Sequence, residues 1–227
     1  MTPELFCAAA RICDAFTPEG GYGLIYGSQA VEPDRSHADL DIVLVGEERP
    51  GAAAMKELVA AVTRIHSDFD LRVDTEVEYE TKLFASYTDV DHAVGLRCFP
   101  RSAGRLRPGP VVTEKGWLNS SDFAQRLVLN ALTGEHLFLG GNVHRYRVDC
   151  ARAERALILL VSSMLGSEDF GAHEAVRALS CGPDGAEGKD YLGYHRNARL
   201  YATVRAGLAR LSRREDRTCD NNATNPS

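Results

Sequence analysis

The sequence predicts an α+β fold, in which a β-sheet flanked by helices is followed by a region made only of helices. Largely apolar runs of strand length lie at residues 23–26 and 39–45. Apolar residues recur at helical spacing before and after these runs, and from residue 120 onward the period is helical throughout. The predicted organisation is a sheet-containing domain, an all-α C-terminal domain and a disordered polar tail, at residues 1–118, 119–213 and 214–227.

Each element of the first domain follows from the spacing of its apolar residues. Residues 3–16 and 52–67 carry them at 3.6-residue spacing and predict amphipathic helices. The first strand ends at a Gly-Ser turn, after which residues 29–30 begin a short helix. Residues 69–79 alternate strictly between apolar and polar, which predicts a half-buried strand, and we expect a further strand at 92–99.

The second domain is predicted from four helical patterns separated by glycine-containing breaks. The first is interrupted at Gly134, and a turn is expected at residues 140–142. The predicted helices lie at residues 121–139, 145–165, 167–179 and 188–212.

Composition excludes several classes of function. The 227 residues carry a net charge of −6, so the chain offers no overall basic field for duplex nucleic acid. It contains no apolar run long enough for a membrane span and no secretory leader pattern, so we expect a cytoplasmic protein. Its six cysteines include no Cys-x-x-Cys pair, which favours free thiols in a reducing compartment over disulfides or structural zinc.

The most informative stretch is Gly27-Ser28, a ten-residue spacer, and then Asp39 and Asp41 at the start of an apolar run. Alternate residues of a strand share a face, with Cα atoms roughly 6.6–6.8 Å apart, so the two carboxylates would lie together. Such a pair can hold two cations about 3.5–4 Å apart, as in two-metal phosphoryl-transfer sites. Gly27 would let a ligand approach the backbone, and the Ser28 hydroxyl could bind phosphate oxygens.

This pattern resembles the DNA polymerase β-like nucleotidyltransferase superfamily, and in particular its small-molecule (antibiotic-type) and minimal branches. The resemblance covers residues 20–80 and implies a mixed β-sheet, two Mg²⁺ ions and an NTP co-substrate. It implies that a later strand provides a third carboxylate, for which Asp74 is the first choice and Glu76 the reserve, and which would also act as the base. Gln29 stands where many relatives carry Arg, so we expect it at the nucleotide with one phosphate contact fewer.

The resemblance implies a Mg²⁺-dependent nucleotidyltransferase. A nucleoside monophosphate, with AMP as the first choice, would pass from an NTP to a hydroxyl of a small molecule, releasing pyrophosphate. Gly27 and Ser28 would hold the β- and γ-phosphates, and the metals would be ligated by Asp39, Asp41 and Asp74. The acceptor would be an antibiotic or a biosynthetic intermediate. Its identity, the choice of NTP and the oligomeric state stay open.

Two other functions stay open. One is an antitoxin-type minimal nucleotidyltransferase that transfers AMP to a partner protein, although such enzymes usually lack so long a helical half. The other is a non-catalytic nucleotide-binding module, which the presence of Gly27, Ser28, Asp39 and Asp41 together disfavours.

Two further groups of polar residues are candidates for contacts with substrate. A basic run that begins at Arg97 and continues with Arg101, Arg105, Arg107 and Lys115 either grips phosphates or forms solvated surface. The resemblance also implies that the helical half builds an acceptor pocket. Side chains there that could line it are His136, His144, Arg145, Arg147, Arg152, Glu154, Tyr191, Tyr194, His195 and Arg196.

Overall fold

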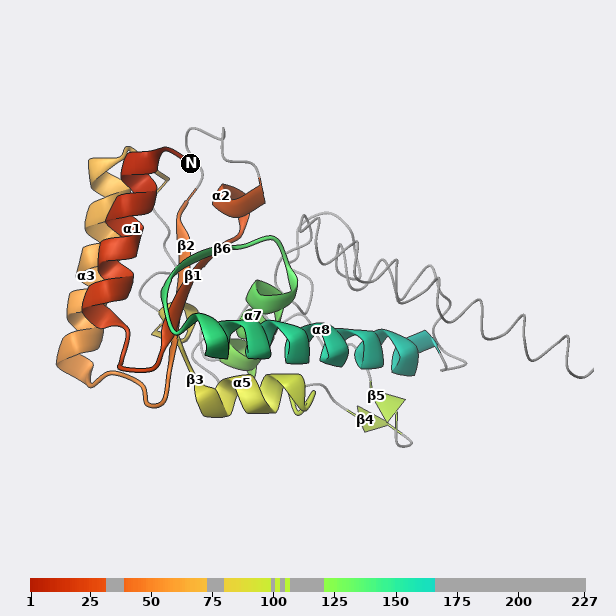
Figure 1. The fold of residues 1–227 in the computed structure, drawn as a ribbon. Helices are drawn as coiled ribbons and strands as arrows, with labels where there is room; N and C mark the ends of the chain where they lie inside the picture. Colours follow the sequence, from red (N-terminus) through yellow and green to blue (C-terminus); the bar gives the residue numbers. More distant parts are fainter. Residues whose placement is uncertain (32–38, 73–79, 99–100, 103–104, 107–120, 166–227) are drawn as a thin grey trace, which may run out of the picture.

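In the computed structural model, the described residues are 1–31, 39–72, 80–98, 101–102, 105–106 and 121–165 (Figure 1). Within them a mixed sheet of four strands has the order β3-β2-β1-β6, with helices on both faces. These strands are β1 (Tyr22–Tyr26), β2 (Asp41–Gly46), β3 (Phe84–Ser86) and β6 (Leu137–Gly141). The predicted α+β class is therefore confirmed. The helices and tail predicted beyond residue 165 lie outside the described residues.

The register of the sheet brings three strand ends together. Strand β1 is antiparallel to both β2 and β6, and Ile25 lies opposite Ile42 on one side and Leu137 on the other. Tyr26, the last residue of β1, is opposite Asp41, the first residue of β2. Strand β1 therefore ends where β2 and β6 begin. We call this the Gly27 end of the sheet, after the residue that follows β1.

One face of the sheet is covered by α1 (Pro3–Phe16) and α3 (Ala52–Asp68), both as predicted. The start of α1 is set by Thr2, whose Oγ1 accepts a hydrogen bond from the Leu5 amide at 3.2 Å. The buried residues of the two helices pack with sheet residues that point to this side, namely Ile25, Ile42, Leu44 and Phe84.

The opposite face, which we call the helical face, is covered by α5 (Tyr87–Val94), α7 (Ser121–Thr133) and α8 (Val143–Leu165). Helix α8 confirms the helix predicted at 145–165. Every residue of α7 from 123 to 133 is buried, as expected of a helix with neighbours on all sides. The sheet residues in this core alternate with those of the other face and include Tyr22, Leu24, Tyr26, Val43 and Val45.

Residues 92–99, predicted as a strand, are instead the end of α5 and a turn in their described part. Helix α5 begins with a capping box, in which Ser86 Oγ accepts from the Asp89 amide at 3.1 Å and the Asp89 carboxylate accepts from the Ser86 amide at 2.9 Å. Val90 and Ala93 then face the core at helical spacing. The apolar run is not a strand because this upstream cap starts a helix.

Residues 137–141 form a strand, although the sequence predicts helix up to residue 139 and a turn at 140–142. Strand β6 pairs with β1 at the side of the sheet. Leu137 and Leu139 pack on the α1–α3 face, whereas Phe138 packs on the helical face. A strand that is apolar on both faces shows no alternation, so spacing alone does not distinguish it from a helix. The sheet and its core consequently extend past residue 118, where the sequence predicts a domain boundary.

The strand predicted at 69–79 does not begin at residue 69. Residues 69 and 70 form the turn after α3, in which Asp70 has a φ of +50° and the Leu71 amide donates to the His66 carbonyl at 2.8 Å. Residues 73–79, with Asp74 and Glu76, lie outside the described residues. The next described element is α4 (Glu80–Leu83), a single turn directly before β3.

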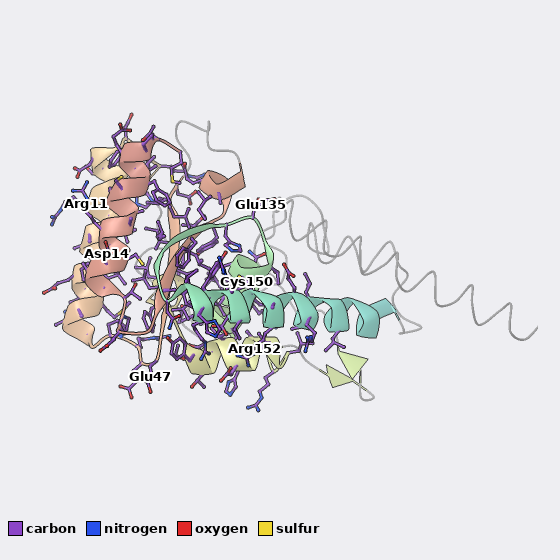
Figure 2. All side chains as sticks on the ribbon, in the orientation of Figure 1. Arg11, Asp14, Glu47, Glu135, Cys150 and Arg152 are labelled. Carbon is purple, nitrogen blue, oxygen red and sulfur yellow. The ribbon has the colours of Figure 1, made fainter. Side chains whose placement is uncertain are left out.

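A buried carboxylate joins α8 to the sheet and to α5. Asp149 is 0% exposed and accepts hydrogen bonds from the Tyr22 hydroxyl at 3.1 Å and from Arg145 Nε at 2.9 Å. Arg152, which lies on the α5 side of α8 in Figure 2, connects Asp149 to Asp91 of α5. Burial raises the pKa of the Tyr22 hydroxyl, and the Asp149 carboxylate raises it further.

This network predicts a specific alkaline destabilisation. An unfolded tyrosine loses its proton near pH 10, whereas the raised pKa keeps Tyr22 protonated in the folded protein. Its contribution is therefore complete below about pH 10 and is lost as the pH rises further. Above about pH 10, we predict that the unfolding free energy falls less steeply with pH in Tyr22→Phe than in wild type. The two slopes should differ by about 1.4 kcal/mol per pH unit. Urea unfolding at alkaline pH measures both slopes, and equal slopes would contradict the assignment.

Candidate functional site

Gly27 turns the chain sharply at the end of β1. Its φ is +73°, a backbone conformation that other residues rarely adopt. A Cβ at this position would collide with Oδ2 of Asp41 on the neighbouring strand. The short helix α2 (Ser28–Val31) follows at once, as predicted, and includes the buried Gln29. The two halves of the Gly-Ser and Asp-x-Asp motif are therefore in contact through Gly27 and Asp41.

Asp41 is held inside the protein at the Gly27 end of the sheet. It is 4% exposed, and it alternates with Val43 and Val45, which places its side chain on the helical face. Asp39 is half-buried and precedes the strand. Because β1 ends at the residue opposite Asp41, pairing does not extend to Asp39. The two predicted metal ligands thus lie close in sequence but not on one strand.

His66 fixes the backbone between the two aspartates. Its Nδ1–H donates to the Val62 carbonyl at 2.9 Å, which leaves Nε2 to accept a hydrogen bond from the Leu40 amide at 3.0 Å. His66 lies in α3 and is 3% exposed. Sequence reasoning missed this role because nothing in a helical pattern indicates that a histidine contacts a strand start far away in the chain.

Lys82 is the direct partner of Asp41. Its Nζ lies 3.1 Å from Asp41 Oδ1, and both side chains are 5% exposed. Lys82 belongs to α4, which packs against β2 and α7. Sequence reasoning missed this residue as well. The one available signal is compositional: Lys82 is one of four lysines in a chain with 22 arginines.

In a buried ion pair of this kind, each charge is stabilised mainly by the other. Removing a carboxylate and an ammonium from water costs several kcal/mol for each ion, and their attraction repays this only at close range. Apolar residues of similar volume often replace such pairs without loss of stability, whereas removing one partner alone costs about 3–5 kcal/mol. The Asp41–Lys82 pair is therefore not required to fill a core, but each charge depends on the other.

The donor chemistry of this site fits a magnesium ion in part. Asp39 and Asp41 supply carboxylate oxygens, which Mg²⁺ prefers. In the described ranges, however, no three His, Cys, Asp or Glu side chains are grouped to hold a metal. Asp74 and Glu76, the predicted third carboxylate and its reserve, lie outside these ranges, and the Lys82 ammonium stands at Asp41 Oδ1.

A cluster of His136, Tyr146 and Cys150, which we call the His136 cluster, lies at the same end of the sheet, on the helical face. His136 directly precedes β6, and its Nδ1–H donates to the Gly134 carbonyl at 2.8 Å, so Nε2 accepts from the Tyr146 hydroxyl at 2.7 Å. Cys150, marked in Figure 2, has its Sγ 3.8 Å from Nε2. Strand β1 separates β6 from β2, so the Cα atoms of His136 and Asp41 are roughly 10 Å apart.

The remaining candidates are placed elsewhere or serve other contacts. Arg97 is exposed in the turn after α5. Arg101 and Arg105 belong to the ribbon of β4 (Arg101–Ser102) and β5 (Arg105–Leu106), which Figure 1 shows well away from α2. Helix α8 carries the predicted acceptor-side residues from His144 to Glu154, of which Arg145 and Arg152 bind Asp149. Arg107, Lys115, Tyr191, Tyr194, His195 and Arg196 lie outside the described residues.

Comparisons with protein-family models, with curated proteins and with solved structures found no match to this chain. Among the described helices, none is long and apolar enough to cross a membrane.

The ion pair predicts strong coupling between two substitutions. Lys82→Met leaves the Asp41 carboxylate buried without its counter-charge, which we expect to lower the unfolding free energy by about 3 kcal/mol. In Asp41→Asn/Lys82→Met neither charge remains. Its loss of unfolding free energy should therefore be smaller than the summed losses of Asp41→Asn and Lys82→Met by at least about 2 kcal/mol. Denaturant unfolding of the four proteins measures the coupling. Additive losses would show that the two side chains do not interact.

Proposed function

We propose that the chain is a Mg²⁺-dependent nucleotidyltransferase, which transfers a nucleoside monophosphate from an NTP to a hydroxyl of a small molecule and releases pyrophosphate. One observation carries this proposal. The glycine corner after β1 and the buried carboxylate that begins β2 are in direct contact, although a ten-residue spacer separates their motifs. A phosphate-binding corner and an acidic metal ligand must be adjacent for this chemistry, because the metal bridges the two.

The residues of the Gly-Ser and Asp-x-Asp motif have the following roles in this proposal. Gly27 lets the triphosphate approach the backbone, and Ser28 follows it at the start of α2. Asp39 and Asp41 would hold Mg²⁺, with Asp74 as the third carboxylate and base, and Glu76 in reserve. When bound, the ions neutralise the charge that develops on the transferred group. His66 keeps the aspartate segment in position through the Leu40 amide.

The acceptor site is proposed on the helical face, beside the His136 cluster. His136 and Tyr146 form a short hydrogen bond two strands from Asp41, and both side chains are partly exposed. A hydroxyl-bearing molecule can exchange hydrogen bonds with a tyrosine and an imidazole. An antibiotic or a biosynthetic intermediate with several hydroxyl groups has the chemistry that this surface would recognise.

A non-catalytic nucleotide-binding module is the second candidate, because the Asp41–Lys82 pair favours it. A carboxylate that already has a buried ammonium partner can support a binding site without any metal. The two candidates differ in whether pyrophosphate is released.

The proposal predicts that Asp41 is essential for turnover. Incubation with each labelled NTP and a panel of aminoglycosides, lincosamides and polyhydroxylated intermediates should release pyrophosphate with at least one acceptor. We expect Asp41→Asn to lower that rate by about 100-fold or more, as is typical when a group that stabilises transition-state charge is removed. Asp68→Asn, at an exposed position at the end of α3, is the matched control and should keep the wild-type rate. Nucleotide binding without pyrophosphate release under any condition would favour the binding module.

A further inference from the structure

We propose that Lys82 is a resident counter-ion that occupies Asp41 until a nucleotide arrives, so that the site rejects free divalent cations. This inference rests on the proposed function and concerns the regulation of the same site. It assigns to Lys82 two alternative partners, the Asp41 carboxylate in the free protein and a phosphate oxygen of the bound nucleotide. Lys82 is thus a positioning residue. By exchanging one partner for the other, it makes the divalent cation bind only after the nucleotide.

The position of the ammonium is set by the fold. Strands β2 and β3 are parallel, with Leu44 opposite Phe84, and Lys82 precedes Phe84 by two residues. The same register brings the start of β2 level with α4. Leu83 and Phe84, which directly follow Lys82, are buried in the core under α1 and α3 and anchor the chain there. Lys82 therefore reaches Asp41 from a fixed backbone, not from a solvated surface loop.

Each oxygen of the Asp41 carboxylate has a close neighbour. Oδ1 of Asp41 is 3.1 Å from Lys82 Nζ, and Oδ2 is packed against Gly27. Both charged side chains are 95% buried, so water screens their interaction only weakly. A second cation approaching Asp41 would meet the positive charge of Lys82 at the same short range.

The arrival of a triphosphate changes this balance. A triphosphate bound at the Gly27 corner brings several negative oxygens next to Asp41, and an ammonium is a common phosphate ligand. Lys82 can then move its hydrogen bond from Asp41 to a phosphate oxygen, which frees the carboxylate for the metal that accompanies the nucleotide. No covalent bond changes in this exchange. Its consequence is that metal binding depends on nucleotide binding.

The test measures Mn²⁺ binding without nucleotide, by the loss of the free-ion signal in electron paramagnetic resonance. Mn²⁺ is the probe because it shares the oxygen preference of Mg²⁺. Wild type is compared with Lys82→Met, and Lys56→Met is the matched control. Lys56 is an exposed lysine of α3, on the opposite face of the sheet, so its substitution removes the same charge elsewhere.

We expect Lys82→Met to bind Mn²⁺ at least about tenfold more tightly than wild type, since a nearby positive charge is removed. Lys56→Met should match wild type, and Asp41→Asn/Lys82→Met should lose the gain. Equal or weaker binding by a folded Lys82→Met would overturn the proposal. Circular dichroism checks the fold, and Lys82→Gln replaces Lys82→Met if that variant does not fold, with the same expected gain.

Two further measurements separate the possible failures. Lys82→Arg keeps the charge and should keep the wild-type Mn²⁺ affinity; a gain as large as that of Lys82→Met would also overturn the proposal. Binding of a fluorescent ATP analogue with Mn²⁺ is measured in wild type and Asp41→Asn. If binding of the ATP analogue depends on Asp41 but Lys82→Met does not change the Mn²⁺ affinity, the proposed function stands and only the role of Lys82 is removed. Absence of Mn²⁺ binding in every variant, with or without the analogue, overturns both.

Discussion

The contact of Asp41 with Gly27 and Lys82 is the constraint on which the Gly27 end of the sheet depends. A buried carboxylate needs a charged or hydrogen-bonding partner at close range, and Lys82 provides it from α4. The opposite oxygen is packed against a residue that has no room for a side chain. The Asp41 side chain, at the start of β2, therefore contacts both the residue that follows β1 and the turn before β3.

The rest of the fold explains why chemistry is expected at this end. Helices cover both faces of the sheet, so every residue of the central strands β1 and β2 is buried. Side chains at the strand ends are those that can meet a ligand without disturbing the core. At the Gly27 end these include a carboxylate, an ammonium and, two strands away, an imidazole hydrogen-bonded to a phenol. The opposite region of the helical face is closed by the Asp149 network, whose groups are used to attach α8.

Local patterns in the sequence predict a large part of this architecture. The helices α1 and α3 follow from apolar stripes, because each has one face in the core and one in water. The glycine corner follows from a Gly-Ser pair after a buried strand, and the structure gives Gly27 the positive φ that explains the glycine. Helix α8 also follows from its periodicity. In each case the information lies within a few turns or strand residues of the element itself.

The missed features depend on partners far away in the chain. Residues 137–141 form a strand because they pair with the side of β1 that β2 leaves open. Their apolar run alone is equally compatible with a helix. Lys82 and His66 gain their roles from contacts across 41 and 26 positions, which no local spacing records. Helix α5 is different, because its capping box Ser86-x-x-Asp89 was visible in the sequence and outweighs the apolar run that follows.

The most direct test of the central claim is a crystal structure of the protein with Mn²⁺ and a non-hydrolysable ATP analogue. We predict anomalous Mn²⁺ density in contact with the Asp41 carboxylate, the triphosphate against the Gly27 corner, and the Lys82 ammonium on a phosphate oxygen. A nucleotide bound elsewhere, with the Asp41–Lys82 pair intact and no Mn²⁺ beside it, would contradict the account.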